Sequence, residues 1–266
     1  MTRQNITVRS LHEMKSAGEK ISVLTSYDAG FTRLIEEAGI EVLLVGDSLG
    51  MVVQGQESTL PVTLDEMVYH TRNVARARES ALLVADMPFM SYRSPALALE
   101  SAGRLMKEGG AQMVKLEGGS VQLETVRRLS SQGIPVCGHL GLLPQSVHKL
   151  GGYRVLGREQ GDASRIREDA RLLQEAGADL LVLECVPGQL AAQITRELSV
   201  PVIGIGAGAA CDGQVLVLYD MLGMNPHPPR FVKNFLASGR TIQEALRAYV
   251  EAVKGGEFPA GEHSFK

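Results

Sequence analysis

Eight short runs of β-branched residues and leucine recur along nearly the whole chain, separated by longer segments with helical periodicity. The runs are ISVLTSY (21–27), EVLLVGD (41–47), ALLVADM (81–87), QMVKLEG (112–118), IPVCGHL (134–140), DLLVLEC (179–185), PVIGIGA (201–207) and QVLVLYD (214–220). A strand that is apolar on both faces has to be buried on both faces, which a helix-coated parallel sheet provides and a half-exposed antiparallel sheet does not. The alternation is typical of repeated βα units.

The segments between these runs carry apolar residues at three- and four-residue steps, which predicts helices with one buried face. They are FTRLIEEAG (31–39), TLDEMVYHTRNVARARES (63–80), SPALALESAGRLMKEGG (94–110), VQLETVRRLSSQG (121–133), ASRIREDARLLQEAG (163–177) and QLAAQITREL (189–198). Several of them end in Gly before the next strand, as helix C-caps do. The last unit differs because GAGAACDGQ (206–214) is too short for an ordinary helix.

Eight strands close a barrel, and 266 residues suit one α/β barrel of about 250 residues. We therefore predict a single TIM-type (β/α)8 barrel domain over 1–266, with an open doubly wound sheet as the alternative. An N-terminal helix is expected at 8–18. Residues 225–236 and 241–259 are predicted to form two further helices that pack outside the barrel or against another subunit.

Charge and cysteine content exclude several classes of protein. The net charge of -3 comes from interspersed charges without a basic run, so nucleic acid is not an expected partner. The N-terminus lacks the apolar core of a signal peptide, and no segment approaches the roughly 18 apolar residues of a membrane span. We predict a cytoplasmic enzyme. Three widely spaced cysteines without a CxxC indicate reduced, mostly buried thiols rather than disulfides or structural zinc.

Four carboxylates follow or end four of the apolar runs. They are Asp47 after EVLLVG, Asp86 after ALLVA, Glu117 within AQMVKLEGG and Glu184 after DLLVLE, and His139 makes a fifth such position. Parallel α/β proteins build their active sites at the carboxyl edge of the sheet. The recurrence of acidic residues at this edge therefore indicates a site that holds positive charge or moves protons.

Taken singly, each acidic residue has an alternative interpretation. Asp47 and Asp86 could cap turns through their side chains, and Glu117 could be a turn residue paired with Lys115. Together the three offer hard oxygen ligands from neighbouring strands, which suits Mg²⁺. Histidine and sulfur ligands for zinc are not clustered in the sequence.

Lys115, His139 and Glu184 have other predicted roles. Lys115 lies two residues before Glu117, so both side chains point to the same face of one strand. It could form a structural ion pair or, as we favour, hold a substrate carboxylate or an enolate oxygen. His139 could be a hydrogen-bonded core residue or could touch a substrate hydroxyl. Glu184 stands apart from the predicted metal ligands and is our first choice for proton transfer.

Two further segments have an open interpretation. The glycine-rich GIGAG (204–208) follows a strand, as barrel phosphate sites do, but it is not a full GxGxxG and no P-loop lysine follows, so it is weak support for phosphate binding. The stretch HKLGGYRVLGREQGD (148–162) predicts a long loop after the fifth strand, either a lid or plain surface.

The motifs VGDSLGMVVQG, ADMPFMSY, VKLEGG, GHLGLLPQSVHKLGGYRVLGR, LECVP and GIGAG occur in this order, and the set resembles the ketopantoate hydroxymethyltransferase family. The resemblance extends from TSYD (25–28) to RFVKNF (230–235). It implies transfer of a one-carbon unit from 5,10-methylenetetrahydrofolate to 3-methyl-2-oxobutanoate with Mg²⁺ bound, giving ketopantoate for pantothenate and coenzyme A. It also implies a homodecamer of two rings of five.

The resemblance assigns Asp47 and Asp86 to the metal, and Glu117 to the metal or its surroundings. The predicted substrate contacts are Asp47, Ser48, Asp86, Lys115 and His139. Glu184 becomes the proton acceptor. A Mg²⁺ ion chelated by a 2-oxo acid would stabilise the enolate formed when the C3 proton leaves, which fits this division of roles.

Two other functions are compatible with part of the pattern. A Mg²⁺-dependent carbon–carbon lyase acting on a 2-oxo acid would share the enolate chemistry but would need no folate. Such lyases tend to carry a catalytic cysteine in a KxCG-like loop, which is missing here. A non-catalytic metabolite-binding barrel would keep the fold but has little use for several acidic residues and a lysine at one edge.

Overall fold

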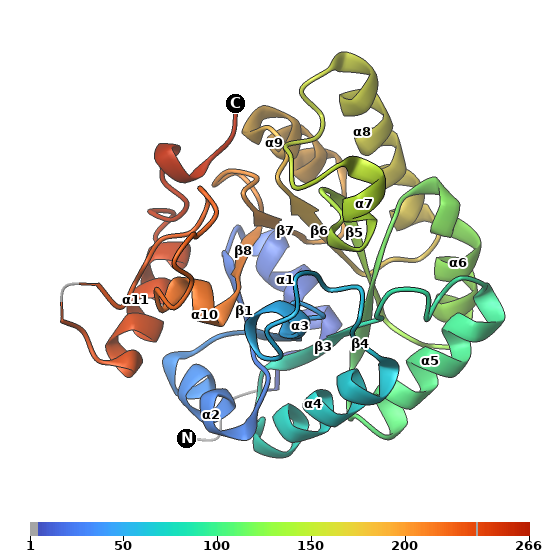
Figure 1. Ribbon diagram of the computed structural model, residues 1–266. Helices are drawn as coiled ribbons and strands as arrows, with labels where there is room; N and C mark the ends of the chain where they lie inside the picture. The colour runs from blue at the N-terminus through green and yellow to red at the C-terminus, as the bar shows by residue number, and fades with distance from the viewer. Residues whose placement is uncertain (1–4, 238) are drawn as a thin grey trace.

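The computed structural model describes residues 5–237 and 239–266 as a closed barrel of eight parallel strands surrounded by helices (Figure 1). The strands are β1 Ile21–Thr25, β2 Val42–Val45, β3 Leu82–Asp86, β4 Met113–Glu117, β5 Val136–Gly141, β6 Leu180–Glu184, β7 Val202–Ile205 and β8 Gly213–Leu216. Each strand pairs with the next in the sequence, and β8 returns to pair with β1. The predicted TIM-type barrel is confirmed, and the open sheet is excluded.

An outer layer of helices covers the barrel. The longer members are α2 Ala29–Ala38, α4 Leu64–Ala77, α5 Pro95–Lys107, α6 Leu123–Ser131, α8 Gln160–Glu175, α9 Gly188–Glu197 and α11 Ile242–Lys254. The short ones are α3 Leu49–Val52, α7 Val147–Leu150, α10 Leu218–Met221 and the 3₁₀ turns η1 Ser120–Gln122, η2 Pro144–Ser146 and η3 Gly261–His263. The Tyr249 hydroxyl of α11 donates to the carbonyls of Val23 on β1 and Gln214 on β8, so α11 covers the seam where the last strand meets the first.

Helix α1 (Val8–Ala17) lies at the amino end of the barrel, opposite the predicted site. The Lys15 ammonium forms an ion pair of 2.6 Å with Asp212, which comes directly before β8. The backbone of Ile6 donates a hydrogen bond to the carbonyl of Ser80, just before β3. These contacts hold the N-terminal segment against the strand beginnings, so the carboxyl ends of the strands remain available for chemistry.

The structure corrects the prediction for the segment after β8. Residues 225–236 were expected to be helical, but they form an irregular segment, because Pro226, Pro228 and Pro229 remove backbone donors and restrict the residues that precede them. The second predicted helix is present as α11. The absence of an ordinary helix between β7 and β8 is also as expected, since the described residues 206–212 form only turns there.

The strands are shorter than predicted. In two of the runs, the last residues leave the sheet and belong to the following turn or helix. The run at 41–47 leaves the sheet after Val45, so Asp47 lies in the turn beyond the ladder. The run at 214–220 ends at Leu216, and its last residues belong to α10. Residues that look like strand in the sequence are thus used to build the rim of the barrel.

The barrel strands are buried on both faces, as their composition predicted. The three cysteines are free thiols with buried side chains, also as expected. Over the described residues, no helix is both long and apolar enough to cross a membrane.

Candidate active site

The predicted site residues meet at the carboxyl edge of the barrel. Asp86, Glu117 and Glu184 are the last residues of β3, β4 and β6, Asp47 lies two residues beyond β2, and His139 is in β5. All five line one cavity of about 580 Å³, together with Ser48 and Lys115. The sequence therefore identified a set of side chains that the fold brings together.

The strand register explains which side chains touch. Asp86 is the ladder neighbour of Lys115, and Glu117 is the neighbour of His139. The Lys115 ammonium accordingly lies 2.8 Å from Asp86 Oδ1, and His139 Nδ1 lies 3.6 Å from Glu117 Oε1. Lys115 and Glu117 share the inner face of β4, as their two-residue spacing predicted.

Asp47 and Asp86 form a buried carboxylate pair, with 5% and 4% of each residue exposed. The backbone N–H of Asp47 donates to Asp86 Oδ2 at 3.0 Å. Lys115 forms an ion pair with Asp86 Oδ1, but no hydrogen-bond donor within the described chain is aligned with this oxygen. Asp86 thus presents a buried, negatively charged oxygen that has capacity for a further cationic partner.

The electrostatics of the site show an excess of negative charge. Burial raises the pKa of Asp47 well above its ordinary value, and the charges of Asp86 and Glu117 raise it further. Burial opposes the charged form of Lys115, but the Asp86, Glu117 and Asp47 carboxylates outweigh burial and leave its pKa raised. One lysine among three carboxylates leaves a charge imbalance that a divalent cation would relieve.

The donor set fits Mg²⁺ bound by two carboxylates. Mg²⁺ usually takes one or two carboxylates and fills its remaining positions with water and substrate oxygens. In the described residues, no three or more His, Cys, Asp or Glu side chains are grouped as a ready metal site. Asp47 and Asp86, which lie side by side, are the pair that fits this pattern. Glu117 lies near them, and its Oε2 is held by a 3.0 Å hydrogen bond from the backbone N–H of Gln145.

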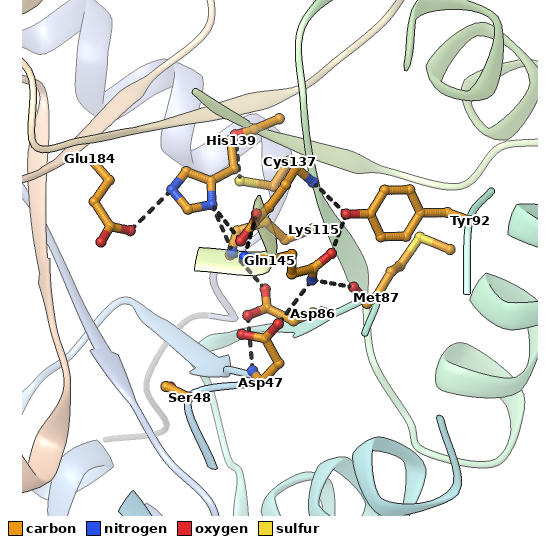
Figure 2. Close-up of polar contacts among 12 residues, drawn as sticks. Asp47, Ser48, Asp86, Met87, Tyr92, Lys115, Cys137, His139, Gln145 and Glu184 are labelled. Carbon is orange, nitrogen blue, oxygen red and sulfur yellow. Dashed lines mark hydrogen bonds and ion pairs between the residues drawn. The ribbon is translucent and has the colours of Figure 1, made fainter. Parts of the chain in front are cut away.

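Glu184 lies on the far side of His139 from the aspartate pair (Figure 2). Its Oε2 is 3.1 Å from His139 Nε2, without the alignment of a hydrogen bond. Burial and the Lys115 charge lower the pKa of His139, but Glu117 and Glu184 outweigh both and raise it to about 9. The Glu184 side chain is 14% exposed, against 5% for Asp86 and 4% for Glu117, so it is the most open carboxylate of the group.

The remaining predicted features surround this centre. Ser48 accepts or donates a 2.8 Å hydrogen bond with the Tyr27 hydroxyl, which fixes it at the cavity. The loop predicted at 148–162 is confined to residues 151–159 between α7 and α8, and Tyr153, Arg154 and Val155 line the cavity. This loop is therefore a wall of the site. Phosphate binding at 204–208 stays a prediction.

Sequence reasoning missed two residues of the polar network, Gln145 and Tyr92 (Figure 2). The Gln145 amide donates to Asp47 Oδ2 at 2.8 Å, and the Tyr92 hydroxyl donates to Gln145 Oε1. Both residues lie within motifs that carry the family resemblance, but neither is charged near neutral pH. Neither residue stands at a strand end, so the pattern of charged strand ends does not include them.

Gly141, at the end of β5, is predicted to be essential for the position of Glu184. Its φ is +91°, and an added Cβ would stand 2.1 Å from the Glu184 carbonyl oxygen. We expect Gly141→Ala to lower the free energy of unfolding by more than about 2 kcal/mol, since backbone strain alone costs about 1–3 kcal/mol. Urea unfolding measures this loss.

Gly133→Ala is the matched control for this prediction. Gly133 also has a positive φ, of +76°, but nothing lies within 4 Å of the place that an added Cβ would take, so only backbone strain is added. We expect a loss of about 1–2 kcal/mol there. Equal losses in the two variants would show that the close approach to Glu184 has no energetic consequence.

Comparison with known protein families and sequences gives one consistent result. The profile of the family described as ketopantoate hydroxymethyltransferase matches residues 5–261. A protein of Nitrosococcus oceani named 3-methyl-2-oxobutanoate hydroxymethyltransferase is 61% identical over 261 residues, covering 98% of this chain and 99% of its own. The protein of the same name from Halorhodospira halophila is 60% identical over 98% of this chain and 95% of its own.

Two solved structures share the fold at much lower sequence identity. A phosphoenolpyruvate phosphomutase of Streptomyces platensis superposes with a TM-score of 0.62 at 15% identity, over 82% of this chain and 83% of its own. A 2,3-dimethylmalate lyase superposes with a TM-score of 0.59 at 18% identity, over 82% of each chain. At such identities the likeness concerns the fold alone, so it does not separate transferases from lyases.

Proposed function

This chain belongs to the ketopantoate hydroxymethyltransferase family, and we propose that it transfers a hydroxymethyl group from 5,10-methylenetetrahydrofolate to 3-methyl-2-oxobutanoate. One observation supports the proposal most strongly. The same cavity is lined by a buried aspartate pair, a lysine and the more open Glu184. That arrangement suits the binding of a 2-oxo acid through its oxygens and the removal of a proton from its neighbouring carbon.

Asp47 and Asp86 would hold Mg²⁺ at one side of the cavity. When bound, Mg²⁺ would polarise the keto oxygen of the substrate and stabilise the negative charge that develops there. Glu117 would bind the ion or orient its surroundings. Lys115, kept protonated by its three carboxylate neighbours, would attract the substrate carboxylate, and Ser48 would add a hydrogen bond.

Glu184 would accept the C3 proton of 3-methyl-2-oxobutanoate. His139, whose Nε2 lies 3.1 Å away, would hold the Glu184 carboxylate in place and balance its charge. Water would release the one-carbon unit as formaldehyde, with both carbon–nitrogen bonds of the carrier broken and the two protons of water taken up by the two folate nitrogens. The C3 carbon would then form a bond with the carbon of formaldehyde, and the oxygen of this carbon would take up the proton that Glu184 removed. General-base removal of the proton typically contributes about 10²- to 10⁴-fold to the rate.

The cavity has room for a second substrate. Its volume of about 580 Å³ lies in the range of sites that hold drug-sized ligands, about 300–1,000 Å³, and exceeds the needs of a small 2-oxo acid. Apolar residues such as Ile205, Phe231 and Phe265 line another part of its wall. We propose that the folate carrier occupies this part.

Product formation tests the proposal. Purified protein with 3-methyl-2-oxobutanoate, 5,10-methylenetetrahydrofolate and Mg²⁺ is expected to give 2-dehydropantoate, measured by mass spectrometry, and EDTA should abolish it. A parallel incubation without protein controls for non-enzymatic addition of released formaldehyde. Folate-independent cleavage of a 2-substituted malate without any 2-dehydropantoate would instead favour the lyase alternative.

A further inference from the structure

A buried amide at the centre of the polar network has no role in the reaction as described above. Gln145 lies in the η2 turn after β5 and is 7% exposed. Its backbone N–H donates to Glu117 Oε2 at 3.0 Å, and its side-chain Nε2 donates to Asp47 Oδ2 at 2.8 Å and to the Met87 carbonyl at 3.0 Å. One residue thus contacts two of the three clustered carboxylates, one beyond the end of β2 and one at the end of β4. Figure 2 shows the contact of its side chain with Asp47.

The surroundings of the amide permit only one orientation. Both partners of Nε2, the Asp47 carboxylate and the Met87 carbonyl, are acceptors, so a rotated amide would place Oε1 against two other oxygens. The Tyr92 hydroxyl donates to Oε1 and also lies 3.4 Å from the backbone N–H of Glu117, from which it accepts. Tyr92 therefore fixes the direction of the whole hydrogen-bond chain.

The Gln145 amide is an uncharged donor, so it holds Asp47 without reducing the negative charge that would attract a cation. A lysine or arginine in place of Gln145 would neutralise Asp47 and compete with a bound cation. An amide holds one oxygen of Asp47 in place and leaves the charge of the carboxylate available. Residues that orient metal ligands in this way typically change metal affinity by about 10- to 100-fold when they are removed.

We propose that Gln145, oriented by Tyr92, is a positioning residue that fixes the Asp47 and Glu117 carboxylates for binding a divalent cation. The inference rests on the proposed function, because it assumes that these carboxylates serve Mg²⁺. It adds that the segment leading from β5 into the 151–159 loop organises the metal site, since Gln145 lies just before α7. The positions of the proposed metal ligands then depend on the η2 turn, and the same stretch of chain continues through α7 into the 151–159 loop that lines the cavity.

The test is a calorimetric titration of the substrate-free protein with Mg²⁺. Gln145→Leu keeps the size of the side chain but removes both Nε2 donors, and we expect about 10- to 100-fold weaker Mg²⁺ binding. Gln214→Leu is the matched control, because Gln214 is also a buried barrel glutamine, 3% exposed, whose amide donates to the Gly208 carbonyl. That variant should bind Mg²⁺ within about twofold of the wild type.

Tyr92→Phe removes a single hydroxyl and provides a second variant in case Gln145→Leu fails to fold. Loss of one neutral hydrogen bond predicts about 2- to 10-fold weaker Mg²⁺ binding. The double variant should bind no more weakly than Gln145→Leu alone, since Tyr92 acts through Gln145. Tyr249→Phe, which removes another buried hydroxyl that donates to backbone carbonyls, should have no effect on Mg²⁺ affinity.

The outcomes separate the positioning role from the proposed function. Wild-type affinity in both Gln145→Leu and Tyr92→Phe would overturn the positioning role and leave the proposed function standing. Equal losses in Gln214→Leu and Gln145→Leu would also overturn it, because general loss of stability would then explain the effect. A wild-type protein that binds no Mg²⁺ would overturn the proposed function and the positioning role together.

Discussion

Replacing Glu184 with Gln is expected to lower turnover by about 10²- to 10⁴-fold while substrate and Mg²⁺ still bind. Gln keeps the size of the side chain and one oxygen, but it cannot accept the C3 proton. The predicted metal site lies across His139 from Glu184, so the variant leaves Asp47 and Asp86 unchanged. Steady-state kinetics measures the change in kcat, and calorimetry measures binding of 3-methyl-2-oxobutanoate and Mg²⁺.

Two results would contradict the role of Glu184. Unchanged turnover would show that another group removes the proton. Loss of Mg²⁺ binding in the variant would indicate that Glu184 is a metal ligand and not the base. Glu175→Gln provides a matched control, because Glu175 is an exposed glutamate on α8 that pairs with Arg171 and should leave both quantities unchanged.

The paired substitution Asp47→Asn with Asp86→Asn is expected to weaken Mg²⁺ binding by more than about 100-fold. Removing a single residue that only hydrogen-bonds to a metal ligand typically lowers metal affinity by about 10- to 100-fold. This variant removes the charges of two proposed ligands, so a larger loss of affinity is expected. Asn retains the shape and one oxygen of each side chain, so the effect reports on charge. Titration calorimetry of the substrate-free protein measures the affinity.

The single variants control for folding. Asp86→Asn leaves the Lys115 ammonium without its 2.8 Å partner and should lower stability, since breaking a buried pair costs about 3–5 kcal/mol. Asp47→Asn removes a carboxylate from beside two like charges and should not destabilise the protein. Asp47→Asn protein that is folded but binds Mg²⁺ with unaltered affinity would refute its assignment as a ligand.

The sequence predicted the barrel and most of the site because both follow from local patterns. Each strand is buried on both faces, and that requirement is visible in one apolar run at a time. Asp86, Glu117 and Glu184 end such runs, so closure of the barrel had to bring them to one edge. The spacing of Lys115 and Glu117 gave their common face for the same reason.

What could not be predicted depends on contacts between distant loops. Gln145 reaches Asp47 across 98 residues of sequence, and Tyr92 reaches Gln145 across 53, and no periodicity encodes either contact. The helix expected at 225–236 is wrong because the prolines of this segment outweigh the helical spacing of its apolar residues. A site built from strand ends is thus easier to predict from sequence than the loops that organise it.

Proton NMR in D₂O follows removal of the C3 proton and formation of the product in the same sample. The protein is incubated with 3-methyl-2-oxobutanoate and Mg²⁺, first alone and then with 5,10-methylenetetrahydrofolate, and the C3 proton and hydroxymethyl signals are followed. We expect protein-dependent loss of the C3 proton signal and, with folate, growth of the hydroxymethyl signal, both abolished by EDTA and by Glu184→Gln. Persistence of the C3 proton under all conditions, with no hydroxymethyl product, would contradict the proposed function.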